Sequence, residues 1–127
     1  AINGPSGSKM PKADNMFLFG DETAMPAIMR IIENNPPETK VNATLALRDV
    51  KDLQAMPDGK QLAIKTVKME DESALLNELY ENYHKFSGCF LFFAAERSQS
   101  TTAREFIKTS SILVKSSKIS SYWTKTN

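Results

Sequence analysis

The sequence has little of the chemistry that metal sites and nucleophilic enzymes use. It contains one cysteine, Cys89, and one histidine, His84. A single cysteine excludes an internal disulfide and a cysteine-rich zinc site, and it fits a reducing compartment. His84 falls near the end of an expected helix and Cys89 at the start of an apolar strand, so neither has an evident catalytic partner. We therefore predict no metal site and no hydrolase chemistry.

An excess of charge of one sign is also lacking. Lys and Arg together number 16 and Asp and Glu 15, which leaves a net charge of +1. Such a chain has no large field to hold a nucleic acid or an anionic membrane. No apolar run is long enough to cross a bilayer, and the polar residues 1–15 do not have the pattern of a signal peptide. We predict a cytoplasmic protein with no nucleic-acid partner and no membrane span.

The apolar residues that are present form an alternating pattern. At 127 residues and 41% hydrophobic composition, the chain suits one folded domain. Three- and four-residue apolar spacing predicts helices, and short apolar runs predict strands between them. Alternating strands and helices predict a doubly wound α/β domain with a mostly parallel sheet and helices on both faces. The expected strands are 16–19, 41–47, 61–67, 89–94 and 118–123, and the expected helices are 24–32, 73–86 and 101–107, the last with an extension to 114 left open.

In such folds ligands bind beyond the carboxyl ends of the strands, so the segment after the first strand is the first candidate site. This segment, GDETAMPAI, has Gly20 to turn the chain, Thr23 near the helix start and Pro26 early in the helix. Free amides there could meet phosphates. Asp21 and Glu22 would oppose a pyrophosphate and suit hydroxyl or amide donors such as a ribose. The alternative, favoured by local physics alone, is that both acids only complement the helix dipole.

The loop expected after the fourth strand is the second candidate wall of a site. It reads FFAAERSQST, and its small Ala94 and Ala95 would let a flat ligand approach closely. A solvated helix start would explain the polar residues of this loop equally well. The candidate site residues here are Ala95, Glu96, Arg97 and Ser98.

Three further residues stand at candidate positions near other strand ends. Arg48 follows the second strand, where a nucleotide-binding fold usually discriminates the adenosine ribose, and its charge would favour a 2′-phosphate. A solvated surface arginine is the competing interpretation. Tyr122 and Trp123 end the last strand, and such aromatic residues are more often core than site.

Four segments together resemble the C-terminal domain of the siderophore-interacting flavoprotein family. They are GPSGS at 4–8, GDETAMPAI at 20–28, FFAAERSQST at 92–101 and SYW at 121–123. Their order and spacing match that domain over nearly the whole chain. The second segment is the specific one, because the family typically carries Gly-Asp-Glu-Thr-Ala-Leu-Pro-Ala there and only Met25 differs.

The resemblance implies a cytoplasmic ferric-siderophore reductase similar to ferredoxin reductases. Residues 1–15 would be the linker from an N-terminal FAD-binding barrel, and residues 16–127 the NAD(P)H-binding domain. Hydride would pass from NADPH or NADH to FAD, and single electrons would then reduce the Fe(III) of a siderophore. By position, the implied cofactor-binding residues are Gly20, Asp21, Glu22, Thr23, Ala24, Pro26, Arg48, Ala95, Glu96, Arg97, Ser98, Tyr122 and Trp123, with Lys125 toward the siderophore.

The sequence departs from the family pattern at several of these positions. Ala95 replaces a glycine, Ser121 replaces the glycine of Gly-Tyr-Trp, and Thr124 replaces a basic residue, for which Lys125 is the substitute. Ala46 stands near the end of the second strand, where the family commonly has an acid. The departures at Ala95 and Thr124 motivate an alternative function, a non-catalytic docking module of a flavoprotein that receives electrons from ferredoxin or another donor.

Overall fold

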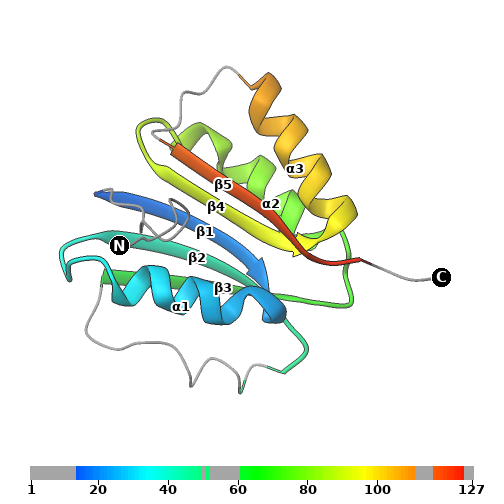
Figure 1. The fold of residues 1–127 in the computed structure, drawn as a ribbon, viewed down its shortest axis with the longest axis horizontal. Coiled ribbons are helices and arrows are strands. Elements are labelled where there is room, and N and C mark those ends of the chain that lie inside the picture. The colour runs from blue at the N-terminus through cyan, green and yellow to red at the C-terminus, as the bar shows by residue number, and fades with distance from the viewer. Residues whose placement is uncertain (1–13, 50, 52–60, 111–115, 125–127) are drawn as a thin grey trace, which may run out of the picture.

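The structure is a computed structural model, and it describes residues 14–49, 51, 61–110 and 116–124. Strands and helices alternate along these residues (Figure 1). In chain order the elements are β1 (Asn15–Asp21), the 3₁₀ helix η2 (Glu22–Ala24), α1 (Met25–Glu33), β2 (Lys40–Leu47), β3 (Gln61–Lys68), α2 (Ala74–Asn82), the 3₁₀ helix η4 (Tyr83–Lys85), β4 (Phe90–Glu96), α3 (Arg97–Thr109) and β5 (Ser116–Trp123).

The strands form one sheet in the order β3-β2-β1-β4-β5, and all neighbouring pairs run parallel. The chain builds from β1 through β2 to β3, and then crosses to the other side of β1 to form β4 and β5 (Figure 1). Strand order therefore reverses between β1 and β4, which is where open α/β sheets bind ligands. The predicted α/β class with a parallel sheet is confirmed.

Helices cover both faces of the sheet because the central strands are apolar on both faces. On one face, α1 packs over a core that includes Met16 and Leu18 of β1. On the other face, α2 and α3 pack over Phe17 and Phe19 of the same strand (Figure 1). Alternate side chains of a strand point to opposite faces, so a continuous apolar run is what a doubly covered strand requires. Burial of each of these side chains stabilises the fold by about 1.5–3 kcal/mol.

Gly20 has a different role from the one predicted for it. It lies inside β1 and has the extended backbone of a strand, so it does not turn the chain. Among the described residues, the glycine with positive φ is Gly88. A Cβ at Gly20 would come within 2.8 Å of Ile28 Cδ1 and 2.9 Å of Ala24 Cβ. The absence of a side chain therefore lets η2 and α1 fold back closely onto the sheet.

The segment after β4 also differs from the prediction. The strand continues through Glu96, and α3 begins at Arg97 rather than near Thr101. The residues expected in a loop, Glu96 to Ser98, thus form a strand end and the first turn of a helix.

Three predictions fall wholly or mostly on residues that the structure does not describe. They are the linker over 1–15, of which residues 1–13 lie outside the described ranges and Asn15 begins β1, the helix extension to 114, and the siderophore-side position Lys125. Within the described ranges, none of the helices combines the length and the apolar character that crossing a bilayer would require.

Candidate functional site at the carboxyl edge of the sheet

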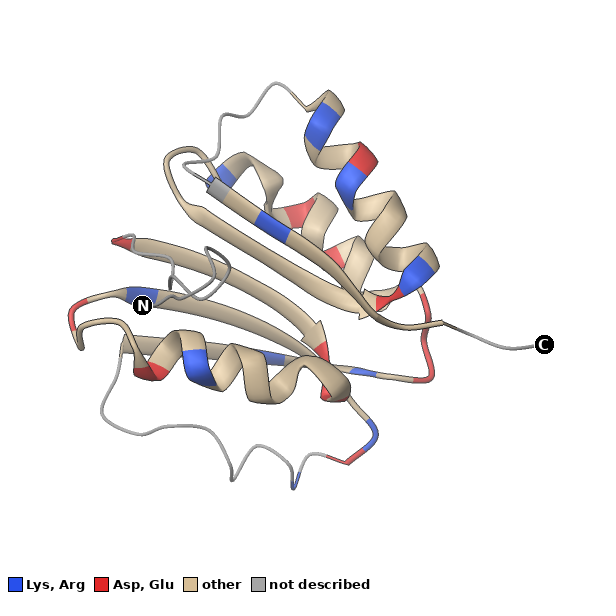
Figure 2. Cartoon of the chain, in the orientation of Figure 1, with Lys and Arg blue, Asp and Glu red and all other residues tan. Residues whose placement is uncertain are grey.

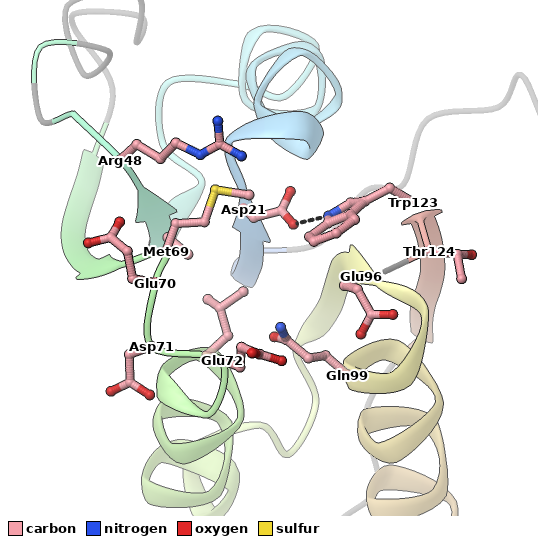
Figure 3. A pocket seen from close by; sticks show the side chains of 12 residues that line it. Asp21, Arg48, Met69, Glu70, Asp71, Glu72, Glu96, Gln99, Trp123 and Thr124 are labelled. Carbon is pink, nitrogen blue, oxygen red and sulfur yellow. Dashed lines mark hydrogen bonds between the residues drawn. The ribbon is translucent and has the colours of Figure 1, made fainter. Parts of the chain in front are cut away.

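A pocket of about 470 Å³ opens at the carboxyl ends of the strands (Figure 3). Its volume lies in the range of small-molecule and cofactor sites. Every strand contributes through its last residues or through the segment that follows it, so the pocket includes the point where strand order reverses. We call it the carboxyl-edge pocket, and its lining residues are Asp21, Ala46, Arg48, Met69, Glu70, Asp71, Glu72, Leu75, Glu96, Gln99, Trp123 and Thr124.

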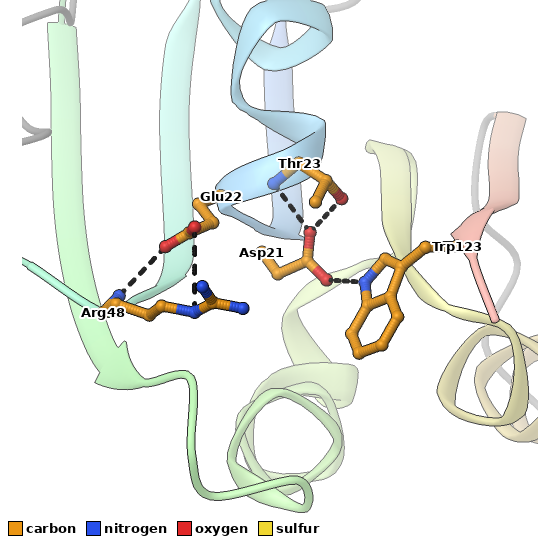
Figure 4. A network of polar contacts seen from close by, with 5 residues as sticks. All are labelled: Asp21, Glu22, Thr23, Arg48 and Trp123. Carbon is orange, nitrogen blue, oxygen red and sulfur yellow. Dashed lines mark hydrogen bonds and ion pairs between the residues drawn. The ribbon is translucent and has the colours of Figure 1, made fainter. Parts of the chain in front are cut away.

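Asp21 is the centre of a buried polar network at this edge (Figure 4). It ends β1 and is 3% exposed. Its Oδ1 accepts hydrogen bonds from the Thr23 amide, at 3.0 Å, and from the Thr23 hydroxyl. Its Oδ2 accepts one from the Trp123 indole Nε1 at 2.7 Å. The network ties the end of β5 to the end of β1 across β4, which lies between them in the sheet.

The same network decides what the start of the first helix can bind. Because Asp21 accepts the Thr23 amide, that amide is not free for a phosphate. Asp21 also serves as the N-cap of η2, as the helix-dipole interpretation of this acid predicted. The expectation that free amides at this helix start could meet phosphates is therefore wrong for Thr23.

Glu22 does not cap the helix but reaches sideways to the end of β2. Its Oε1 accepts a hydrogen bond from the backbone amide of Arg48 at 3.2 Å, and its Oε2 lies 3.9 Å from the Arg48 Nε (Figure 4). The Glu22 side chain is 28% exposed and that of Arg48 is 71% exposed. Arg48 is thus a surface residue, as the competing interpretation predicted, but it has a carboxylate beside it and lines the pocket.

Glu96 caps the helix that follows β4, as Asp21 caps the helix that follows β1. It is 5% exposed, and its Oε1 accepts hydrogen bonds from the Ser98 amide, at 2.9 Å, and from the Ser98 hydroxyl. This cap starts α3 directly after the strand. Two strand-end acids, both buried and both lining the pocket, therefore flank the point where strand order reverses.

The small residues predicted for the site belong to the packing beneath it. Gly20 and Ala24 are buried under the first helix turn, and Ala95 is fully buried in β4. The Ala95 amide donates to Ser100 Oγ at 3.3 Å, and that hydroxyl donates to the Ser120 carbonyl at 2.6 Å, which fixes α3 to β5. In this structure Gly20, Ala24 and Ala95 are buried beneath the carboxyl edge of the sheet, where a ligand would not contact them.

The pocket is acidic. Its lining includes the carboxylates of Asp21, Glu70, Asp71, Glu72 and Glu96, against the single guanidinium of Arg48. Figure 2 shows acidic residues along the connection between β3 and α2, which forms one wall. Such a lining opposes phosphates at short range and favours hydroxyl donors, amide donors or a cationic ring. No group of three or more His, Cys, Asp or Glu side chains in the described residues is arranged to hold a metal ion.

The structure brings together part of the predicted site. Asp21, Arg48, Glu96 and Trp123 line the carboxyl-edge pocket. Arg97 and Ser98 line a shallower hollow of about 420 Å³ that shares Glu96 and Thr124 with it. Among the other predicted residues, Thr23 and Pro26 are exposed at the helix start, and Tyr122 is 41% exposed in β5.

The wall between β3 and α2 was missed by the sequence analysis. It contributes Met69, Leu75 and the acidic run at 70–72, and the first turn of α3 contributes Gln99. A signal for the acidic run existed, because it directly follows an expected strand and the carboxyl ends of parallel strands meet at one edge.

Comparisons with known proteins agree with this architecture. A family model described as siderophore-interacting protein matches residues 13–126. The solved siderophore-interacting protein of Acinetobacter baumannii is similar, with 19% identity and a TM-score of 0.78 over 90% of this chain and 47% of that one. The siderophore-interacting protein SipS of Aeromonas hydrophila is also similar, with 20% identity and a TM-score of 0.75 over 93% of this chain and 49% of that one. The chain spans about half the length of both. None of the curated proteins matches it significantly.

Proposed function

Since this chain belongs to the siderophore-interacting protein family, we propose that it is the NAD(P)H-binding part of a ferric-siderophore reductase. In this proposal, FAD is bound mainly by a domain outside the chain, to which residues 1–15 would be the linker. NADPH or NADH supplies a hydride to the FAD, and the reduced flavin supplies the electrons that convert Fe(III) in a siderophore to the more weakly held Fe(II). The siderophore is the substrate, and the reaction would take place in the cytoplasm.

The observation that carries the proposal is the place of the carboxyl-edge pocket. It lies where a sheet of order β3-β2-β1-β4-β5 reverses its strand order, the crevice in which such folds bind dinucleotides. On the β2 side the exposed guanidinium of Arg48 would meet the 2′-phosphate of an adenosine ribose. On the β4 side Glu96 and the ring of Trp123 line the wall beside which a nicotinamide would lie.

The charge of the pocket supports the nicotinamide end of this assignment. The nicotinamide ring becomes cationic when its hydride has left, and Asp21 and Glu96 line the part of the pocket beside Trp123. Fixed carboxylates stabilise a cation in a partly enclosed site, so they would favour the oxidised ring. The pyrophosphate would have to stay away from these acids, because like charges repel and because the Thr23 amide, already donated to Asp21, is not free to offset the repulsion.

Calorimetric titration of the 127-residue chain with NADPH and with NADH, at low and moderate salt, tests the proposal. We expect both to bind, and Arg48→Ala to weaken NADPH about tenfold while changing NADH little, because the guanidinium meets only the 2′-phosphate. Binding of neither dinucleotide, by a chain whose circular dichroism shows it folded, would contradict a dinucleotide site in this chain.

A second function is favoured by the acidic lining and by the occupied Thr23 amide, both of which oppose a pyrophosphate. In it the chain is a docking module of a flavoprotein that receives electrons from ferredoxin or another donor. Stopped-flow mixing of the flavin-loaded protein that contains this chain with NADPH or NADH separates the two functions. Rapid bleaching of the flavin absorbance by a dinucleotide would exclude the docking module, and bleaching only by reduced ferredoxin would support it.

A further inference from the structure

We propose that Glu22 supplies the carboxylate that recognises the adenosine ribose, and that the Glu22–Arg48 pair sets the choice between NADH and NADPH. The inference rests on the proposed dinucleotide function. Dinucleotide-binding sheets of this order commonly use an acid near the end of the second strand to bind the ribose 2′-hydroxyl. The end of β2 has Ala46 instead, and the acid comes from a different segment of the chain.

Sheet register brings Glu22 to that position. Asp21, the last residue of β1, is paired with Ala46, and β2 ends one residue later at Leu47, so Glu22 and Arg48 both follow the strands at the same edge of the sheet. There the Arg48 amide donates to Glu22 Oε1 at 3.2 Å. A backbone amide of the β2 end thus holds the carboxylate in place, and it does so whatever the Arg48 side chain does.

The two side chains of the pair prefer different ligands. A carboxylate accepts hydrogen bonds from the free 2′- and 3′-hydroxyls of the NADH ribose, and it repels the 2′-phosphate of NADPH. The guanidinium of Arg48 donates to a phosphate and gains little from a hydroxyl. Glu22 therefore favours NADH and Arg48 favours NADPH.

Glu22 also competes with the ligand for the guanidinium of Arg48. With Oε2 3.9 Å from Nε and the Arg48 side chain 71% exposed, the contact is a solvent-exposed ion pair. Such pairs contribute about fivefold or less to an equilibrium. A 2′-phosphate can therefore draw Arg48 away from Glu22 at small cost, and removal of Glu22 frees the guanidinium for it.

The test measures the ratio of NADPH affinity to NADH affinity in the 127-residue chain by calorimetry. We expect Glu22→Gln to weaken NADH about threefold and to tighten NADPH about threefold, which moves the ratio about tenfold toward NADPH. Arg48→Gln should move the ratio about tenfold the other way, and the double variant should return it to within about threefold of the wild type. The adenosine fragments 2′,5′-ADP and 5′-AMP should show the same shifts as the dinucleotides.

Glu33→Gln is the matched control, because it removes the same charge from an exposed position at the last residue of α1. It should leave the ratio within about twofold of the wild type. If the dinucleotides bind and Glu22→Gln leaves the ratio unchanged, or changes it no more than Glu33→Gln does, the inference is wrong and the proposed function stands. A shift seen with the dinucleotides and not with the fragments would also overturn it. If no dinucleotide binds the folded wild-type chain, the proposed function fails first.

Discussion

The replacement Asp21→Asn is the sharpest perturbation of the network that organises the carboxyl edge. The asparagine keeps the size of the side chain but replaces one acceptor oxygen with an NH₂ donor. Asp21 accepts through both oxygens: Oδ1 from the Thr23 amide, at 3.0 Å, and from the Thr23 hydroxyl, and Oδ2 from the Trp123 indole at 2.7 Å. Either orientation of the new amide therefore sets its NH₂ against one N–H donor.

The expected cost follows from the burial of Asp21, which is 3% exposed. The NH₂ of the asparagine would be buried at this position without an acceptor, and a buried donor that has no acceptor costs about 1–3 kcal/mol. For a domain of this size, about 2 kcal/mol corresponds to a fall in Tm of about 8 °C. Urea denaturation followed by far-ultraviolet circular dichroism measures the change in the free energy of unfolding.

Asp71→Asn is the matched control. Asp71 accepts from the Ser73 amide at 3.1 Å and from the Ser73 hydroxyl at 2.9 Å through one oxygen, the same local arrangement as Asp21 and Thr23, but it is exposed. Its asparagine can turn the NH₂ to solvent, so the cost should stay below about 0.5 kcal/mol. Equal costs for the two variants would refute the donor-against-donor argument. In a Trp123→Phe background, which removes the indole donor, the cost of Asp21→Asn should fall by about 1 kcal/mol or more.

Three further predictions concern the packing and the charges around this edge. Gly20→Ala should destabilise the domain by about 1–3 kcal/mol in urea denaturation, because its Cβ would lie 2.9 Å from Ala24 Cβ; an unchanged midpoint would contradict this close packing. The hydrogen bond from Lys65 to Glu78, at 2.6 Å, raises the pKa of Lys65 above 10.5. A lysine whose pKa is higher in the folded than in the unfolded state stabilises the folded state at pH values below the unfolded-state pKa. Lys65→Met should therefore lower the urea midpoint at neutral pH, and the difference from the wild type should shrink as the pH rises beyond 10.5. Burial raises the pKa of the Cys89 thiol, so iodoacetamide should alkylate it at least about tenfold more slowly in the folded chain than in urea; equal rates would show that the thiol is accessible.

The sheet could be predicted from the sequence because its central strands are apolar on both faces. The run Met16 to Phe19 has no polar residue to point at solvent, and the run Phe90 to Ala95 has none either. Only a strand covered on both sides can use such a run, and strands of this kind separated by amphipathic helices give a parallel sheet. The class of fold follows from these two runs and the helical spacing between them.

The start of α3 was misplaced because only its apolar residues were counted. Its first turn is polar, and Glu96 caps it by accepting a hydrogen bond from the Ser98 amide. Glutamate is not among the preferred N-cap residues, so the residue types at this position give no strong helix-start signal in the sequence. The contact between Glu96 and Ser98 is visible only in the structure.

The site itself could be predicted only in part, because its contacts cross long stretches of chain. Asp21 and Trp123 are 102 residues apart, and nothing local in either segment indicates that they share a hydrogen bond. The pairing of Glu22 with Arg48 depends on the register of β1 against β2. Strand order and register are properties of the whole sheet, and the spacing of residues along one strand does not contain them.

The proposed function requires that a nicotinamide dinucleotide bind in the carboxyl-edge pocket. Titration of the ¹⁵N-labelled chain with NADPH, followed by amide and indole resonances, tests it most directly, because Trp123 is the only tryptophan and gives a single indole N–H signal. If the dinucleotide binds there, this signal and the amide signals of Asp21, Arg48 and Glu96 should shift together. Shifts confined to the opposite edge of the sheet, where Lys40 and Phe90 begin their strands, would contradict it, as would the absence of any shift at saturating dinucleotide.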